Sequence, residues 1–132
     1  MSPTTIRFLK AGMAYLLLGA LLGTLLAVPF TRDGMYQVPG AQWRLAHTHL
    51  NLAGFVLMII FGVAYHILPR FAGKPLNSEA WASAHFWIAT FATGGMVIGF
   101  IVPAAALLLW AGSVAQLAGI VLGVVNLWLT IR

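Results

Sequence analysis

Long apolar runs separated by short polar segments divide the chain into four parts. The first run, Ala11–Phe30, and the second, Leu45–Pro69, contain no Asp, Glu, Lys or Arg. The stretch from Ala80 to Ile131 also contains none, and it is about twice as long as one membrane crossing. It must therefore hold a reversal, which we place at Gly99–Pro103. The pattern predicts one transmembrane domain over residues 1–132, with helices at about 6–30, 43–69, 79–101 and 104–131.

These lengths fit α-helices that cross a hydrocarbon core of about 30 Å, whereas a β-barrel would need short alternating strands. The expected fold class is all-α, an integral membrane four-helix bundle. Its orientation follows from the basic residues, because cytoplasmic segments are rich in Lys and Arg. Both termini are expected in the cytoplasm of a multi-pass protein of the bacterial inner membrane. The side with the termini would carry Arg7, Lys10, Arg70, Lys74 and Arg132, against Arg32 and Arg44 on the other.

The composition agrees with a protein embedded in the lipid bilayer. Hydrophobic residues make up 61% of the chain and charged residues 7%, with a net charge of +5. A soluble domain needs roughly a quarter of its residues charged, so soluble enzymes and disordered tails are excluded. The basic residues stand at the ends of the apolar runs, which favours topology over nucleic acid binding as their explanation. Without cysteine there is no disulfide, no thiolate metal site and no covalently attached haem.

The first and fourth predicted helices carry glycine at the same spacing. Such stripes let helices approach closely, within a bundle or across a dimer, so we interpret them as packing surfaces. A duplicated gene is the alternative explanation. The stripes are Gly12, Gly19 and Gly23 in the first helix and Gly112, Gly119 and Gly123 in the fourth.

The predicted topology places the four histidines at two depths in the membrane. His47 and His49 lie near the outer surface, and His66 and His85 near the inner surface. Ionisable residues are costly in a membrane span and usually face a partner or a cavity. On a uniform α-helix His49 points almost opposite to His47, and His66 lies about 100° from it. His66 and His85 are placed to face one another on antiparallel helices.

Neutral imidazole is the usual axial ligand of non-covalent haem and also suits copper and zinc. We expect haem b, one or two per protomer, with copper or zinc as the alternatives. Arginine near a ligand could pair with the haem propionates, or it could only mark a helix end. Each histidine could instead be an interfacial residue bonded to a carbonyl or water. The candidate ligands are His47 first, then His85 and His66, then His49, while Met96 is more simply a core residue; the candidate propionate partners are Arg44 and Arg70.

The stretch from Arg44 to Arg70 reads RLAHTHLNLAGFVLMIIFGVAYHILPR, followed by GKPL at 73–76 and AHFW at 84–87. It resembles the second and third helices of haem–copper oxidase subunit I, and most closely the nitric oxide reductase and cbb3-type branches. In that family the histidine at the outer start of this helix is an axial ligand of the low-spin haem b, and it maps onto His47. The resemblance implies a truncated four-helix relative. Because the family builds its binuclear centre from many more helices, we do not expect an oxidase by itself.

Three functions remain open from the sequence. The first is a small b-type cytochrome that carries electrons, with a quinol or a redox protein as partner. It would form a homodimer or higher homo-oligomer, in which His49 of one copy or a small exogenous ligand completes the iron opposite His47 of another. The second is a haem-based sensor or handler of NO or O₂ with an open iron position. The third is a haem-free copper-binding, zinc-binding or structural membrane subunit.

No catalytic nucleophile or acid–base pair is visible in the spans. The only carboxylates, Asp33 and Glu79, lie in loops on opposite sides of the membrane. Any chemistry would therefore belong to a cofactor.

Overall fold

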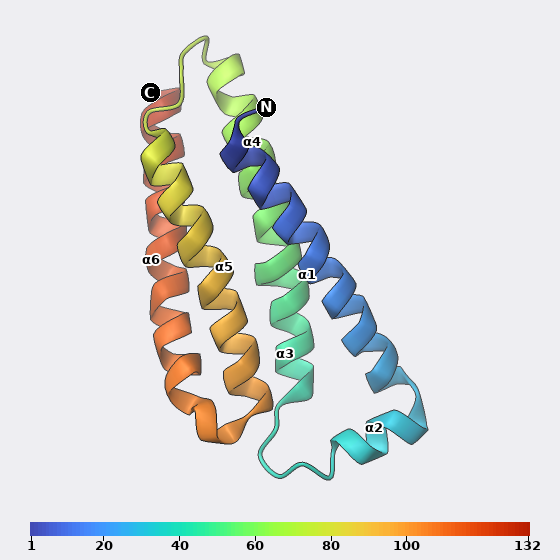
Figure 1. Ribbon diagram of the computed structural model, residues 1–132. Coiled ribbons are helices and arrows are strands. Elements are labelled where there is room, and N and C mark those ends of the chain that lie inside the picture. Colours follow the sequence, from blue (N-terminus) through green and yellow to red (C-terminus); the bar gives the residue numbers. More distant parts are fainter.

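Four apolar helices, each long enough to cross a membrane, make up the computed structural model, which describes residues 1–132. Figure 1 shows them lying side by side, with both termini at the same end of the molecule. We call this end the inner end, after the charge-based prediction, and the opposite end the outer end. The predicted all-α four-helix architecture is confirmed. The spans are α1 (Pro3–Ala27), the continuous helix α3–η1–α4 (Trp43–Phe71), α5 (Glu79–Ile101), and the turn η2 with α6 (Pro103–Ile131).

The first helix ends earlier than the sequence pattern predicts. α1 is capped by Ser2, whose side chain accepts from the Thr5 N–H at 3.2 Å, and it stops at Ala27 instead of residue 30. Val28 is extended because proline disfavours helical geometry in the residue before it, and Pro29 follows. Pro29 instead opens a short helix, α2 (Pro29–Met35), in a segment that we expected to be mostly loop. Proline at a first helical position explains this start.

The second span is one long helix with a change of winding inside it. It comprises α3 (Trp43–His49), the π-helical η1 (Leu50–Val56) and α4 (Leu57–Phe71), and so runs two residues past the predicted end at Pro69. A π-helix bonds i to i+5 instead of i to i+4, which rotates the residues after it relative to those before it. The 100° angle that a uniform α-helix gives between the outer and inner histidines therefore does not apply.

The reversal between α5 and α6 overlaps only the end of the predicted segment Gly99–Pro103, because α5 continues to Ile101 and the turn extends to Ala105. Val102 is extended and Pro103 begins η2 (Pro103–Ala105), which leads into α6 (Ala106–Ile131). The segment between α2 and α3 contacts this reversal, because the Gln42 N–H donates to the Phe100 carbonyl at 2.7 Å. The start of α3 is thus fixed against the end of α5.

The helices pack as two close pairs, α1 with α3–η1–α4 and α5 with α6. Both glycine stripes are used inside the bundle, as the packing interpretation predicts. Tyr15 of α1 joins the pairs, since its ring lies on Gly54 and its hydroxyl donates to the Thr90 carbonyl at 2.6 Å. The neighbours of the α1 stripe are Met58 and Ile59 at Gly12, Asn51 at Gly19 and His47 at Gly23; those of the α6 stripe are Ala92 and Met96 at Gly112, Ile88 at Gly119, and His85 and Phe61 at Gly123.

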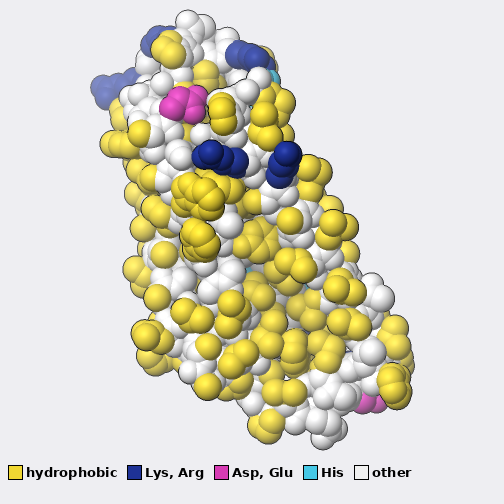
Figure 2. All heavy atoms as spheres, viewed as in Figure 1, with side chains coloured by type: hydrophobic (Ala, Val, Ile, Leu, Met, Phe, Trp, Pro, Cys, Tyr) yellow, Lys and Arg dark blue, Asp and Glu magenta, His cyan; other side chains and the backbone are white.

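Hydrophobic side chains cover most of the visible surface, and Lys and Arg gather towards the inner end (Figure 2). Large apolar residues on the sides of the helices are strongly exposed, among them Leu17 and Val114 at 72% each. Such a surface is stable in hydrocarbon and not in water. The chain is therefore a multi-pass membrane protein.

We predict that Gly123→Ala destabilises the bundle by about 1–3 kcal/mol, the usual cost of overpacking a tight core. A Cβ at this position would lie 2.5 Å from Cε1 and Nδ1 of His85 and 2.9 Å from Phe61 Cε1. Thermal unfolding of the detergent-purified protein measures the effect. Gly34→Ala is the matched control, because a Cβ there meets nothing within 4 Å. Equal melting temperatures for the two variants would contradict the packing.

Candidate functional site

His47 lies in the last turn of α3, directly before the π-helical turn, and is half-buried against α1. Its ring rests on Gly23, where a Cβ would come within 2.7 Å of Cε1. Only glycine at this position of α1 leaves space for the imidazole. The glycine stripe thus serves the histidine as well as the packing of the two helices.

The partner of the ring determines where its proton sits. His47 Nδ1 lies 2.9 Å from the Gly19 carbonyl, and a carbonyl can only accept, so Nδ1 carries the hydrogen and donates it. Nε2 then keeps its lone pair. Nε2 makes no hydrogen bond. Every buried side-chain nitrogen and oxygen in the structure has a hydrogen-bond partner, so Nε2 must be accessible at the surface. An imidazole held by an Nδ1–H···O=C bond with a bare Nε2 is the usual form of a metal-ligating histidine.

Asn51, four residues after His47, supports this arrangement. Its amide group donates to the His47 carbonyl at 2.8 Å and packs on Gly19. The amide nitrogen also lies 3.3 Å from His47 Nδ1, but the shorter contact to the Gly19 carbonyl decides the tautomer. This bond joins residues four apart, so ordinary helical spacing places the amide beside the His47 carbonyl.

Arg44 stands one turn before His47 in α3, at the outer end. Its Nε donates to the Tyr36 hydroxyl at 3.1 Å, and with Trp43 it lines a hollow of about 350 Å³. No carboxylate neutralises it, because the one ion pair of the structure joins Arg32 to its neighbour in sequence at 2.9 Å. A free guanidinium beside an accessible imidazole can bind a carboxylate of a ligand that the imidazole holds.

His49 points to the opposite side of the helix, as predicted. Its Nδ1 donates to the Leu45 carbonyl at 2.9 Å, and its ring lies 4.7 Å from that of Phe100 in α5. It lines a groove of about 410 Å³ together with Met96 and Gln116. His49 Nε2 is also without a hydrogen-bond partner, but no arginine lines this groove.

His85 lies in closed packing near the inner end, with 1% of its surface exposed. Its Nδ1 bonds the Tyr65 hydroxyl at 2.9 Å, and the ring stands 4.4 Å from Phe61 and 5.1 Å from Phe8. Gly123 covers a further side. This box of aromatic rings and glycine leaves no space for a porphyrin beside the imidazole.

A polar network closes the inner end beside this box. Asn126 is fully buried, donates to the Ser78 carbonyl at 2.8 Å and accepts from the Asn77 side chain at 3.2 Å. The Thr130 hydroxyl accepts a hydrogen bond from the Asn77 backbone N–H at 3.0 Å. Single polar residues in an apolar helix are the only trace of this network in the sequence.

His66 is hydrogen-bonded to Arg70, which lies one turn later in α4. Arg70 Nη1 donates to His66 Nε2, and because the guanidinium cannot lose its proton, the lone pair of that nitrogen is taken. The two inner histidines thus bond to other side chains and not to each other. Arg70 turns back onto its own helix.

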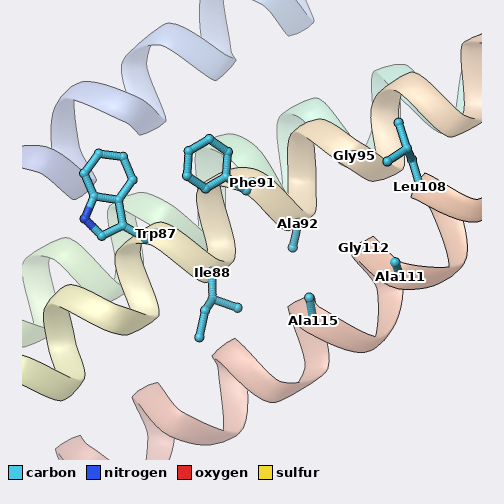
Figure 3. A pocket seen from close by; sticks show the side chains of 9 residues that line it. All are labelled: Trp87, Ile88, Phe91, Ala92, Gly95, Leu108, Ala111, Gly112 and Ala115. Atoms are coloured by element: carbon cyan, nitrogen blue, oxygen red, sulfur yellow. The ribbon is translucent and has the colours of Figure 1, made fainter.

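No group of three His, Cys, Asp or Glu side chains gathers in the structure. A shallow trough between α5 and α6, of about 390 Å³, is lined by apolar and small residues without any ligating group (Figure 3). The donor set that fits a haem is therefore at the outer end, where His47 presents a bare Nε2 beside Arg44.

We predict that the apo-protein shows His47 with Nδ1 protonated and Nε2 bare, and that Gly23→Ala disturbs this state. The added methyl would push the ring from the Gly19 carbonyl, so Nδ1 would lose its acceptor. Imidazole ¹⁵N chemical shifts distinguish the two nitrogens. His49 is the internal control, since its Nδ1 faces a carbonyl of its own helix. A wild-type His47 with its proton on Nε2 would contradict the geometry.

The chain is similar to known membrane oxidase subunits. The model of the family "Cytochrome C and Quinol oxidase polypeptide I" matches residues 1–132. The cbb3-type cytochrome c oxidase subunit CcoN1 of Stutzerimonas stutzeri is 27% identical over 93 residues, 70% of this chain and 19% of its own length. A cytochrome c oxidase subunit 1 homolog of Agrobacterium tumefaciens is 32% identical over 76 residues, 57% of this chain and 12% of its own length.

The chain thus spans at most about a fifth of these curated relatives, and no solved structure matches it. Because the family model covers every residue of the chain, the protein belongs to the cytochrome c and quinol oxidase polypeptide I family.

Proposed function

We propose that the protein is a small membrane-embedded b-type haem protein in which His47 is an axial ligand of the iron. The observation that carries this proposal is the His47 Nδ1–H bond to the Gly19 carbonyl, which leaves Nε2 free and accessible. Membership of an oxidase family supports haem as the group that this nitrogen binds. When bound, haem supplies one-electron chemistry that no side chain of this chain can provide.

Arg44 has a second role in this proposal, as the partner of the haem propionates. It lies on the same face of α3 as His47, three residues away, and its charge is not paired with a carboxylate. The Tyr36 hydroxyl holds Nε, so the two terminal nitrogens of the guanidinium remain free to donate. Arg70 is a weaker partner, because it already donates to His66.

Electron transfer is the activity that this arrangement supports best. The only carboxylate in a span, Glu79, is the first residue of α5 at the inner end, and the chain covers at most about a fifth of the curated oxidase subunits, so we do not extend oxygen reduction to it. A quinol or a redox protein is the partner that such a carrier in the bacterial inner membrane requires. A sensor or handler of NO or O₂ is the second candidate, since only one free imidazole faces this site and an iron with one protein ligand stays open.

We predict that His47→Ala lowers haem affinity by at least about tenfold, since even a lost second-shell contact costs that much at metal sites. The Soret absorbance per chain after haem reconstitution measures the effect. His66→Ala is the matched control, because its ring is engaged at the inner end, and it should leave the spectrum unchanged. A Soret band that survives His47→Ala would remove the basis of the proposal.

We predict that Arg44→Gln weakens haem binding by roughly tenfold, the equivalent of one charge-assisted hydrogen bond of about 1.5 kcal/mol. Iron ligation should stay intact, so the absorption maxima should hold while the dissociation rate to apomyoglobin rises. Arg32→Gln is the control, because Arg32 is already paired with Asp33. Equal dissociation rates for the two variants would show that Arg44 only marks the start of α3.

A further inference from the structure

The groove that His49 lines, of about 410 Å³, lies between the second span and α6 and includes the buried Met96 of α5. Leu52 of the second span is 57% exposed and Leu117 of α6 is 64% exposed. Because these two residues stand on the two walls, the groove is open to the lipid. Its volume is within the range of small-molecule sites, about 300–1,000 Å³.

Gln116 of α6 places a hydrogen-bond donor in this groove. Only 7% of the residue is exposed, and its Oε1 accepts from the buried Thr93 hydroxyl at 3.4 Å. The amide nitrogen has no hydrogen-bond partner, whereas every buried side-chain nitrogen has one, so this nitrogen must reach the surface that Gln116 lines, which is the groove. Lipid tails accept no hydrogen bond, so its two N–H groups are left without an acceptor in the bilayer.

His49 supplies a hydrogen-bond acceptor on the facing wall. Its Nδ1–H is donated to the Leu45 carbonyl, so Nε2 carries a lone pair, and this nitrogen too is accessible because it has no partner. The hydroxyl groups of Thr48 and Ser113 already donate to carbonyls of their own helices. The groove therefore holds one free acceptor and one free donor.

The lining of the groove favours an uncharged ligand. No Lys, Arg, Asp or Glu belongs to it. A phosphate group or an ionised carboxylate would have no counter-charge there, and an unpaired charge in apolar surroundings is very costly. The head groups of phospholipids and the anions of fatty acids therefore do not suit this site.

The two polar groups lie at different depths in the hydrocarbon. At about 1.5 Å per residue, His49 is about 9 Å below the start of α3 and Gln116 about 15 Å below the start of α6. These starts are at a similar level, since Gln42 bonds Phe100 beside the reversal. A span of 29 residues is about 44 Å long, so about 7 Å at each end extends beyond a hydrocarbon core of about 30 Å.

We propose that this groove binds an uncharged, lipid-soluble ring that carries an oxygen at each end, the chemistry of a hydroquinone. The hydroxyl at one end donates to His49 Nε2, and the oxygen at the other end accepts from the Gln116 amide. The two oxygens of a carboxyl group sit on one carbon and match the difference in depth less well. The groove is on the side of the second span opposite to His47, so the site does not rest on haem binding there.

The first experiment changes the ligand and not the protein. The full chain in phosphatidylcholine nanodiscs is titrated with a decyl-substituted hydroquinone, kept reduced with ascorbate, and with its di-O-methyl ether. The ether cannot donate to His49, so we expect its dissociation constant to be about tenfold higher, the equivalent of one lost hydrogen bond. Equal affinities would overturn the proposal. Displacement of the hydroquinone by monoolein at equal concentration would also overturn it.

The second experiment repeats these titrations with variants. His49→Phe keeps a ring against Phe100 and removes the acceptor, so the hydroquinone should bind about tenfold more weakly and no better than the ether. Gln116→Met keeps the length of the side chain and should also weaken binding. Ser113→Ala is the matched control, because this hydroxyl lines the groove but already donates to Leu109. A preference for the hydroquinone that survives His49→Phe would overturn the assignment.

Imidazole ¹⁵N chemical shifts locate the bound ring without a variant. The His49 Nε2 signal should move on titration with the hydroquinone, whereas the His47 Nε2 signal should stay in place. A moving His47 signal would overturn the site. The titration uses haem-free protein, so binding by a chain that takes up no haem would remove the proposed function and leave this site standing. No binding, with an oligomeric mass that His49→Phe changes, would show that the groove is a protein contact.

Discussion

The hydrogen bond from His47 Nδ1 to the Gly19 carbonyl is the contact on which the outer half of the structure depends. A bilayer offers no water to a polar nitrogen, so an imidazole in a span must find a partner in the protein. A carbonyl has two lone pairs and can accept this proton besides its helical bond. The ring reaches it only because Gly23 has no side chain. One contact thus joins α1 to α3, selects the tautomer and leaves Nε2 available.

The same requirement has the opposite consequence at the inner end. His85 also finds its partner inside the protein, but this partner is the Tyr65 hydroxyl, within a box of aromatic rings. Around His47 the packing stops at α1 and leaves one side of the ring open, whereas around His85 it is complete. Two histidines beside glycines of matching stripes therefore differ in environment, since His47 keeps an accessible nitrogen and His85 is part of the core.

The sequence was sufficient for what depends on average hydrophobicity and spacing. It predicted the four spans, the reversal before Pro103 and the packing use of both glycine stripes. It did not predict α2, which begins at a proline after one extended residue, or η1, in which the bonding shifts from i+4 to i+5. Neither feature changes the hydrophobic periodicity of the sequence. It also could not choose the partners of His66 and His85, which Arg70 and Tyr65 satisfy, since one sequence pattern is compatible with several hydrogen bonds.

Both glycine stripes pack against other helices of the same chain, so they are not available for contacts between copies. The remaining sides of the helices are covered by large apolar residues. Lipid tails are as apolar as these side chains, so such surfaces give no strong preference for protein over lipid. Specific association in the bilayer then has to come from close packing of small residues and from a directed bond. The exposed face of α1 beside Gly23 carries small residues of the kind that allow close packing.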